Sequence, residues 1–151
     1  MTTNGDAAAW LSRLLLSVLP ARDLMGVEVR AADDSGVRLH YPLDPCWIGP
    51  GDIVSGPATL AMADSVIYAA AQLALGIEHV AVVADMTVRF VAPARAADIE
   101  AVARVEGQEG RRLHLTGLLS QDGRPILEIV ASCAGIRPPP GFPAIEPLPD
   151  C

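Results

Sequence analysis

The feature that most constrains this 151-residue chain is one long, almost uninterrupted apolar stretch, residues 56–75. It reads GPATLAMADSVIYAAAQLAL, with Pro57 suited to a first helical turn and Gly76 suited to a helix end. Apolar residues occupy nearly every face at helical spacing. We therefore expect a helix that is buried all round, rather than one with a single apolar stripe. Such a helix has to be enclosed by the rest of the chain.

A single carboxylate, Asp64, interrupts this stretch two turns inside the expected helix. An ionised carboxylate in apolar surroundings costs several kcal/mol, roughly, unless it is paired or neutralised. A cap is not needed that far inside a helix, so the favoured interpretation gives Asp64 a role in chemistry. The alternative is that Asp64 bonds a neighbouring backbone group.

Segments in which apolar and polar residues alternate lie on both sides of the helix and predict β-strands. Two precede the helix and four follow it with short turns, of which Asp122-Gly123 is a strong signal for a tight hairpin. Four hairpin-linked strands with one apolar face each predict a single antiparallel sheet that curls around the helix, an α+β fold. The expected strands are 25–31, 37–41, 80–92, 98–106, 112–120 and 126–136.

The strand expected over 80–92 has an apolar face and a polar face. We interpret the polar face equally as the wall of a binding site or subunit seam, or as a solvated strand face. The apolar face is expected to hold Val80, Val82, Ala84, Met86, Val88 and Phe90, and the polar face Asp85, Thr87 and Arg89.

The length suits one domain with a sizeable core. We expect an N-terminal helix within residues 1–20 that Asp6 caps, the main domain over 21–137, and an irregular proline-rich tail over 138–151. The stretch 42–56 is rich in Pro and Gly. A loop this long inside a compact domain is often functional.

Composition excludes several classes of function. The formal net charge of −7 argues against nucleic acid as a partner, because phosphate binding needs a basic stripe. The histidines show no metal-ligand spacing, and every apolar stretch has a polar break, so we expect no metal site and no membrane crossing. Widely spaced cysteines without a CxxC pair fit reduced thiols in the cytoplasm, and these are Cys46, Cys133 and Cys151.

Several motifs occur in a combination that is more specific than each alone. The chain has PGDIVSGP before the expected helix, LAMAD within it, a strand DMTVRFVAPA that ends at a proline, and a last hairpin with GRRL and DG, at residues 50–57, 60–64, 85–94, 110–113 and 122–123. Over roughly residues 20–137 this pattern resembles the hotdog fold. Within that fold it resembles acyl-CoA thioesterases of the phenylacetate-pathway (PaaI-like) type.

The resemblance implies roles for two residues. In such enzymes the helix acid is the general base or nucleophile of thioester hydrolysis, and the first glycine of the loop motif offers its N–H to the carbonyl oxygen. By position these roles fall to Asp64 and Gly56. A helix N-terminus suits a developing oxyanion, and apolar surroundings raise the pKa of a carboxyl group toward useful values. The Asp64 group and the Gly56 donor would come from different subunits of a dimer.

The resemblance also implies an enzyme without a metal or redox cofactor, with coenzyme A only as part of the substrate. Its dimer would join two sheets edge to edge, and the dimer could pair again as a tetramer.

Three positions differ from the common family pattern. The usual His-Gly-Gly motif is Ser55-Gly56-Pro57 here, a form that one branch carries. Trp47 stands near the place of a loop Asn, and Val83 stands where a Ser or Thr often helps the acid. We expect Ser55, Pro57, Trp47 and Val83 to lie at the substrate, with Trp47 either a packing residue or a lid over the pocket.

Other candidates each have an ordinary alternative. Tyr68 follows Asp64 by one turn on the same side of the helix and is either a pocket residue or a core tyrosine. Asp85 and Arg89 belong to the polar strand face already described. Arg89 or Arg137 could meet coenzyme A phosphates, although most surface arginines are simply solvated.

Two functions of different kinds remain open at this point. The favoured one is hydrolysis of an acyl-CoA. The alternative is a hotdog module that binds acyl-CoA or another apolar ligand without turnover, which the departures at Pro57 and Trp47 motivate. A purely structural dimer is a third interpretation. The sequence leaves open the acyl group, the choice between dimer and tetramer, and whether Asp64 is a base or a nucleophile.

Overall fold

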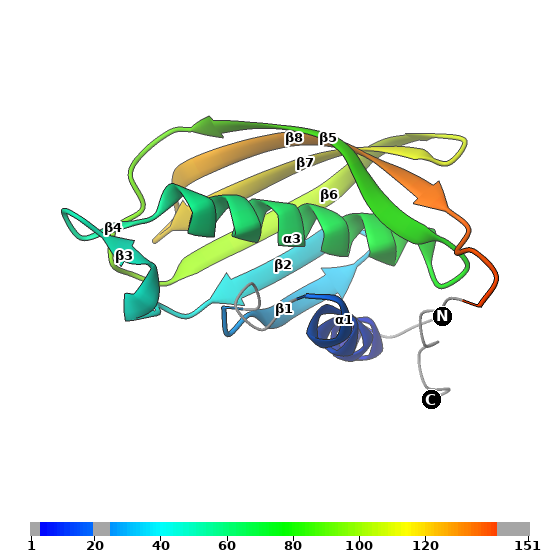
Figure 1. The fold of residues 1–151 in the computed structure, drawn as a ribbon, viewed down its shortest axis with the longest axis horizontal. Helices are drawn as coiled ribbons and strands as arrows, with labels where there is room; N and C mark the ends of the chain where they lie inside the picture. The colour runs from blue at the N-terminus through cyan, green and yellow to red at the C-terminus, as the bar shows by residue number, and fades with distance from the viewer. Residues whose placement is uncertain (1–3, 20–24, 142–151) are drawn as a thin grey trace.

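The computed structural model describes residues 4–19 and 25–141, and Figure 1 shows their arrangement. One long helix, α3, lies inside a strongly curved sheet, and a second helix, α1, lies beside the first strand. The elements in chain order are α1 (Asn4–Val18), β1 (Glu28–Asp33), β2 (Gly36–Tyr41), the 3-10 turn η1 (Pro45–Trp47), β3 (Ile48–Gly49), β4 (Ile53–Val54), α3 (Gly56–Leu75), β5 (Val80–Phe90), β6 (Ile99–Glu109), β7 (Arg112–Gln121) and β8 (Arg124–Ile136).

The sheet has six strands in the order β1-β2-β6-β7-β8-β5, and each neighbouring pair is antiparallel. The inner face packs on α3 through fully buried aliphatic residues such as Leu39, Ala101 and Leu115. A small two-stranded pair, β3 with β4, precedes α3. The expected α+β hotdog fold, an antiparallel sheet wrapped around one long helix, is therefore confirmed.

The N-terminal helix is present and packs against β1 and α3. Trp10, Leu11, Leu14 and Leu15 form its buried face. The helix begins two residues before Asp6, so Asp6 lies in the first turn and is not the N-cap that the sequence suggested. Most of the expected proline-rich tail lies outside the described residues.

Two predicted turn positions are confirmed by their backbone angles. Asp122 and Gly123 have φ values of 49° and 75°, the pair of positive angles that a two-residue type I′ hairpin requires, and they join β7 to β8. Gly76 ends α3 with a φ of 71°. Beside it, the buried amide of Gln72 donates to the carbonyl oxygens of Gly76 and His79 and accepts from the Ala81 N–H. This amide fixes the path from the helix into β5.

The expected alternation along β5 is wrong in its first half. Ala81 is buried and Val83 is half-buried toward α3, whereas Val82 is 43 % exposed. The register with β8 shifts between Val83 and Asp85, which places one extra residue, Ala84, in this strand. Such a β-bulge reverses the alternation of side chains. The first-half residues assigned to the apolar face, Val80 and Val82, therefore point to the outer face.

The expectation that α3 is buried all round is also wrong for the single chain. Met62, Ala63, Val66 and Ile67 are fully buried, but Asp64 is exposed. The sheet encloses α3 from one side only, so the opposite face has no covering element within the described chain. Burying the Asp64 charge would cost free energy only if another molecule covered this face of α3.

By length and hydropathy, α3 is the one helix in the described part of the chain that could cross a membrane. More than half of that stretch is buried inside the fold, and core helices commonly meet the same criteria. The expectation that the chain crosses no membrane stays a prediction.

Candidate active site

The N-terminus of α3 is held by Ser55, which precedes the first helical residue. Its backbone is extended (φ −60°, ψ 146°), and its Oγ accepts a hydrogen bond from the Ala58 N–H at 3.4 Å. Gly56 is the first helical residue, and Pro57, which has no N–H, follows in the first turn. First-turn N–H groups have no acceptor inside the helix. The Gly56 N–H therefore lies at the positive end of the helix dipole.

An apolar cavity of about 430 Å³ opens beside Gly56. Its polar side chain is Thr59, whose hydroxyl donates to the Gly56 carbonyl oxygen at 2.9 Å. Among the described residues, no charged side chain lines it. The lining residues come from β4, α3, β5 with the loop after it, and β8, and they are Ile53, Val54, Gly56, Thr59, Phe90, Val91, Ala92, Pro93, Ala94, Ile126 and Leu127.

Asp64 lies eight residues after Gly56 on the same helix, which corresponds to about 12 Å along the axis at 1.5 Å per residue. It is exposed on the face of α3 that the sheet does not cover, together with Leu60, which is 37 % exposed. Asp64 does not line the cavity at Gly56. Within one chain, the structure therefore does not bring the two predicted catalytic residues together.

The charge of Asp64 acts on two buried groups beneath the helix. Burial raises the pKa of the Tyr41 hydroxyl; the nearby Ser65 hydroxyl opposes this rise, and the Asp64 charge adds to it. Burial raises the pKa of the Cys133 thiol to about 11, and the charges of Asp64 and Asp85 contribute. Both groups therefore stay protonated near neutral pH.

Trp47 lies next to the helix start, as the last residue of the 3-10 turn. Its carbonyl oxygen accepts the Ser55 N–H at 2.9 Å, and its side chain is half-buried. Strand β4, just before α3, is tied to the loop after β5, because the Val54 N–H donates to the Ala94 carbonyl oxygen at 2.8 Å. These bonds fix the loop against the cavity wall.

Tyr68 and Val83 lie away from the cavity. Tyr68 is half-buried on α3, and burial raises its pKa. Val83 is half-buried on the inner face of β5, opposite Cys133. Neither residue lines the cavity beside Gly56, so their roles at a substrate stay predictions.

Asp85 and Arg89 lie on the outer face of the sheet, on the side away from α3. Asp85 accepts a hydrogen bond from the Ser132 hydroxyl, and Arg89 pairs with Glu128 on the neighbouring strand. Both are exposed in the single chain. Neither residue lines the cavity beside Gly56, and the choice between a subunit seam and a solvated strand face stays a prediction.

Within residues 4–19 and 25–141, no group of three or more His, Cys, Asp or Glu side chains is placed to hold a metal ion. His40 lies between two carboxylates. Its Nε2 is 3.1 Å from Asp98, and its Nδ1 contacts Glu100.

The sequence pointed to Gly56 but to only part of the cavity wall around it. Phe90, Val91, Ile126 and Leu127 come from the end of β5 and the start of β8, which pair in the sheet but lie far from Gly56 along the chain. The motif that contains Phe90 and Val91 was a signal for part of this wall. No sequence signal pointed to Ile126 and Leu127, because their place at the cavity depends on sheet pairing.

The sheet curved around one long helix defines the class of hotdog proteins, and the apolar cavity lies at the N-terminus of that helix. The family model described as the thioesterase superfamily matches residues 51–126, about half of the chain. The chain therefore belongs to the thioesterase superfamily. The matched segment includes both Gly56 and Asp64.

Several solved structures resemble the chain over most of its length. A phenylacetic-acid-degradation-related protein from Ralstonia eutropha JMP134 is 25 % identical, with a TM-score of 0.68, and the match covers 83 % of this chain and 98 % of that one. A thioesterase family protein from Silicibacter pomeroyi is 18 % identical with a TM-score of 0.78 (87 % and 99 % covered). The E. coli PaaI protein of the phenylacetic acid degradation operon is 15 % identical with a TM-score of 0.76 (89 % and 96 %). No curated protein sequence matches the chain.

Proposed function

We propose that this protein hydrolyses the thioester of an acyl-CoA to the free acid and coenzyme A. The observation that carries the proposal is the position of Gly56, whose N–H stands at the start of α3 beside an apolar cavity. The cavity suits an acyl group, and the helix end suits the oxyanion that develops when a thioester carbonyl is attacked. Membership of the thioesterase superfamily supports the same class of reaction.

In this reaction Asp64 acts in one of two ways. As a general base it takes a proton from water while the water oxygen attacks the carbonyl carbon. As a nucleophile it forms an acyl anhydride that water then hydrolyses. In both mechanisms the C–S bond breaks, and the sulfur leaves as the coenzyme A thiolate, which is then protonated. The Gly56 N–H stabilises the oxyanion in both.

A complete site needs two copies of the chain. A thioester that accepts a hydrogen bond from Gly56 is too far from the Asp64 of the same helix, about 12 Å along the axis. Reacting groups must approach to about 3 Å. We therefore pair the Gly56 of one subunit with the Asp64 of the other, which lies on the uncovered face of α3.

The edge of the sheet supports such a pairing. β5 is eleven residues long and pairs with β8 on one side; within the described chain no strand pairs with its other side. A long free edge is usually covered, and a second β5 would cover it. Val82 and Phe90, 43 % and 56 % exposed, lie on this strand. We propose a dimer joined at this edge, or a pair of such dimers.

The cavity also indicates the kind of acyl group. Because the described lining is apolar apart from Thr59 and the Gly56 backbone, an uncharged acyl group fits and a terminal carboxylate would be left without a partner. We further propose that the enzyme acts in the cytoplasm and needs no metal or redox cofactor.

The test is thiol release from a panel of short, medium, long, aromatic and dicarboxylic acyl-CoAs, with wild type beside Asp64→Asn. The proposal expects release from uncharged members that depends on Asp64. Full release by Asp64→Asn would overturn the assigned chemistry. Binding by thermal shift with no release from any member would favour the non-catalytic module instead.

A further inference from the structure

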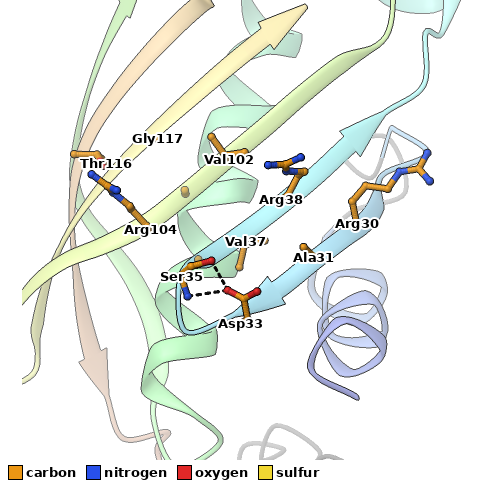
Figure 2. A pocket seen from close by; sticks show the side chains of 12 residues that line it. Arg30, Ala31, Asp33, Ser35, Val37, Arg38, Val102, Arg104, Thr116 and Gly117 are labelled. Atoms are coloured by element: carbon orange, nitrogen blue, oxygen red, sulfur yellow. Dashed lines mark hydrogen bonds between the residues drawn. The ribbon is translucent and has the colours of Figure 1, made fainter. Parts of the chain in front are cut away.

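The outer face of the sheet, on the side away from α3, carries a groove of about 620 Å³ (Figure 2). Its floor lies where side chains are short, at Ala31, Gly36 and Val102. Gly36 has a φ of +133°, and a Cβ there would stand 2.3 Å from the Ala103 carbonyl oxygen. Only glycine permits the β1–β2 turn to approach β6 this closely. The close approach of this turn to β6 is therefore set by the backbone.

Three arginines surround this floor, one from each of β1, β2 and β6. Figure 2 shows Arg38 between Arg30 and Arg104. The chain has eleven basic residues in all and a net charge of −7. Three cations around one groove on an acidic protein therefore form a distinct local surface.

Arg38 is the arginine with unused hydrogen-bonding capacity. Within residues 4–19 and 25–141 its guanidinium makes no hydrogen bond or ion pair. Its register partner on β6 is Val102, and its partner on β1 is Ala31, so apolar groups flank its base. A guanidinium presents five N–H donors in a planar fork, which matches the oxygens of a phosphate.

The other two arginines keep donors for a ligand although each has a carboxylate neighbour. Arg104 donates from Nε to Glu106 at 2.6 Å, and Arg30 pairs with Glu28. The guanidinium side chains are 66 % and 52 % exposed, so these pairs are weak and exchange readily with a stronger anion. Each pair leaves several N–H groups unused.

The carboxylate that lines the groove is already engaged. Asp33 Oδ1 accepts the backbone N–H of Ser35 at 2.7 Å and also the Ser35 hydroxyl (Figure 2). This turn places the acid at one end of the groove. The Thr116 hydroxyl and Arg104 hold the pKa of Glu106, the acid beside Arg104, below its usual range, so it stays charged at neutral pH.

We propose that this groove is a second ligand site, which binds the phosphate groups of a small phosphorylated molecule through Arg38, with Arg30 and Arg104 at its sides. The volume lies within the range of small-molecule sites. The site is separated from Gly56 and the apolar cavity by the sheet itself. The phosphate could belong to the nucleotide end of coenzyme A or to a free nucleotide.

The test is calorimetric titration of the full-length protein with pyrophosphate, adenosine 3′,5′-bisphosphate and ATP at low and at physiological salt. We expect saturable binding of at least one probe that weakens with salt. Arg38→Gln should weaken it at least about tenfold, since charged bonds to the phosphate are lost. Arg124→Gln, which removes an exposed arginine at the start of β8, is the matched control and should bind as wild type does.

No saturable binding of any probe, or equal affinity in Arg38→Gln and wild type, would overturn the proposal. Sedimentation of both proteins adds a second readout. If Arg38→Gln changes the mass of the assembly and leaves probe binding intact, the groove is an interface between copies of this chain and the proposal fails.

The same variants distinguish the source of the phosphate. This kinetic experiment rests on the proposed hydrolysis, whereas the binding experiments do not. If Arg38→Gln raises KM for an acyl-CoA but not for the same acyl group on N-acetylcysteamine, the phosphate is that of coenzyme A. If neither KM changes, it belongs to a free nucleotide. Asp64→Asn should bind all three probes as wild type does, so failure of the hydrolysis proposal leaves the binding test intact.

Discussion

Gly56 and Asp64 belong to one helix, yet they face different surroundings about 12 Å apart along its axis. Gly56 lines the apolar cavity, and Asp64 is exposed on the face of α3 that the sheet leaves open. The two residues can act on one thioester only if they come from two chains.

Asp64→Asn should lower kcat at least about 10²-fold, the usual loss when a general base is removed, and the loss is larger if Asp64 is the nucleophile. The melting temperature of the purified variant should stay near that of wild type, because the side chain is exposed. Steady-state thiol release measures kcat, and a thermal melt measures the melting temperature. A variant with wild-type kcat would exclude Asp64 from the reaction.

Gly56→Pro should lower kcat about 10²- to 10³-fold, because it removes the N–H proposed to hold the oxyanion. Proline suits the first helical position, and the extended backbone of Ser55 is compatible with a following proline. Gly56→Ala is the matched control: it keeps the N–H, and its Cβ would meet nothing within 4 Å. Equal kcat in the two variants would show that this N–H plays no part.

Mixing Asp64→Asn with Gly56→Pro subunits should restore activity that neither variant has alone. After random exchange half of the dimers are mixed, and each mixed dimer has one intact site of two, so about a quarter of wild-type activity should return. Denaturation and joint refolding, or co-expression with two tags, provides the exchange. Absence of recovery in verified mixed dimers would place both residues of a site on one chain.

Ser55→Ala should destabilise the protein by about 0.5–1 kcal/mol, because the N-cap bond to the Ala58 N–H is lost. The low end of the range applies, since this bond is long at 3.4 Å. Ser55→Asn should keep most of the stability, because Asn also caps well. Urea unfolding of the three proteins measures this, and equal midpoints for Ala and wild type would mean that the cap contributes nothing.

Cys133 should make stability fall at alkaline pH. Its pKa is about 11 in the folded protein and about 8.5 in an unfolded chain, so the unfolded state loses the proton first as pH rises. The contribution is complete below about pH 8 and is lost as pH rises toward 11, with a size on the order of 2 kcal/mol. Urea unfolding of wild type and Cys133→Ala from pH 8 to 11 measures it. The difference in free energy of unfolding between the two proteins should shrink as pH rises. A difference that stays constant with pH would contradict this account.

Much of the fold follows from local patterns in the sequence. The apolar run at 56–75, the alternating segments and the Asp122-Gly123 turn each specify structure through residues that are neighbours along the chain. The sheet around a single helix follows from them, because an apolar helix has to be enclosed by whatever strands the chain supplies.

The site follows from the sequence only in part. The motif around Gly56 locates the start of the helix, but Phe90 and Leu127 reach the cavity through strand pairing that no local pattern encodes. No local pattern indicates the arginine groove for the same reason, since Arg30, Arg38 and Arg104 lie on three strands.

The sequence by itself determined which segments form helix and strands, because hydrophobic period and turn residues act over a few neighbours. Only the tertiary structure decided which side of each element is covered. One extra residue in β5 reversed the faces of Val80 and Val82, since every side chain before a bulge changes sides relative to those after it. The sheet encloses α3 from one side, and this leaves Asp64 on the open face. Burial is a property of packing between distant segments, and it therefore cannot be read from the period of one segment alone.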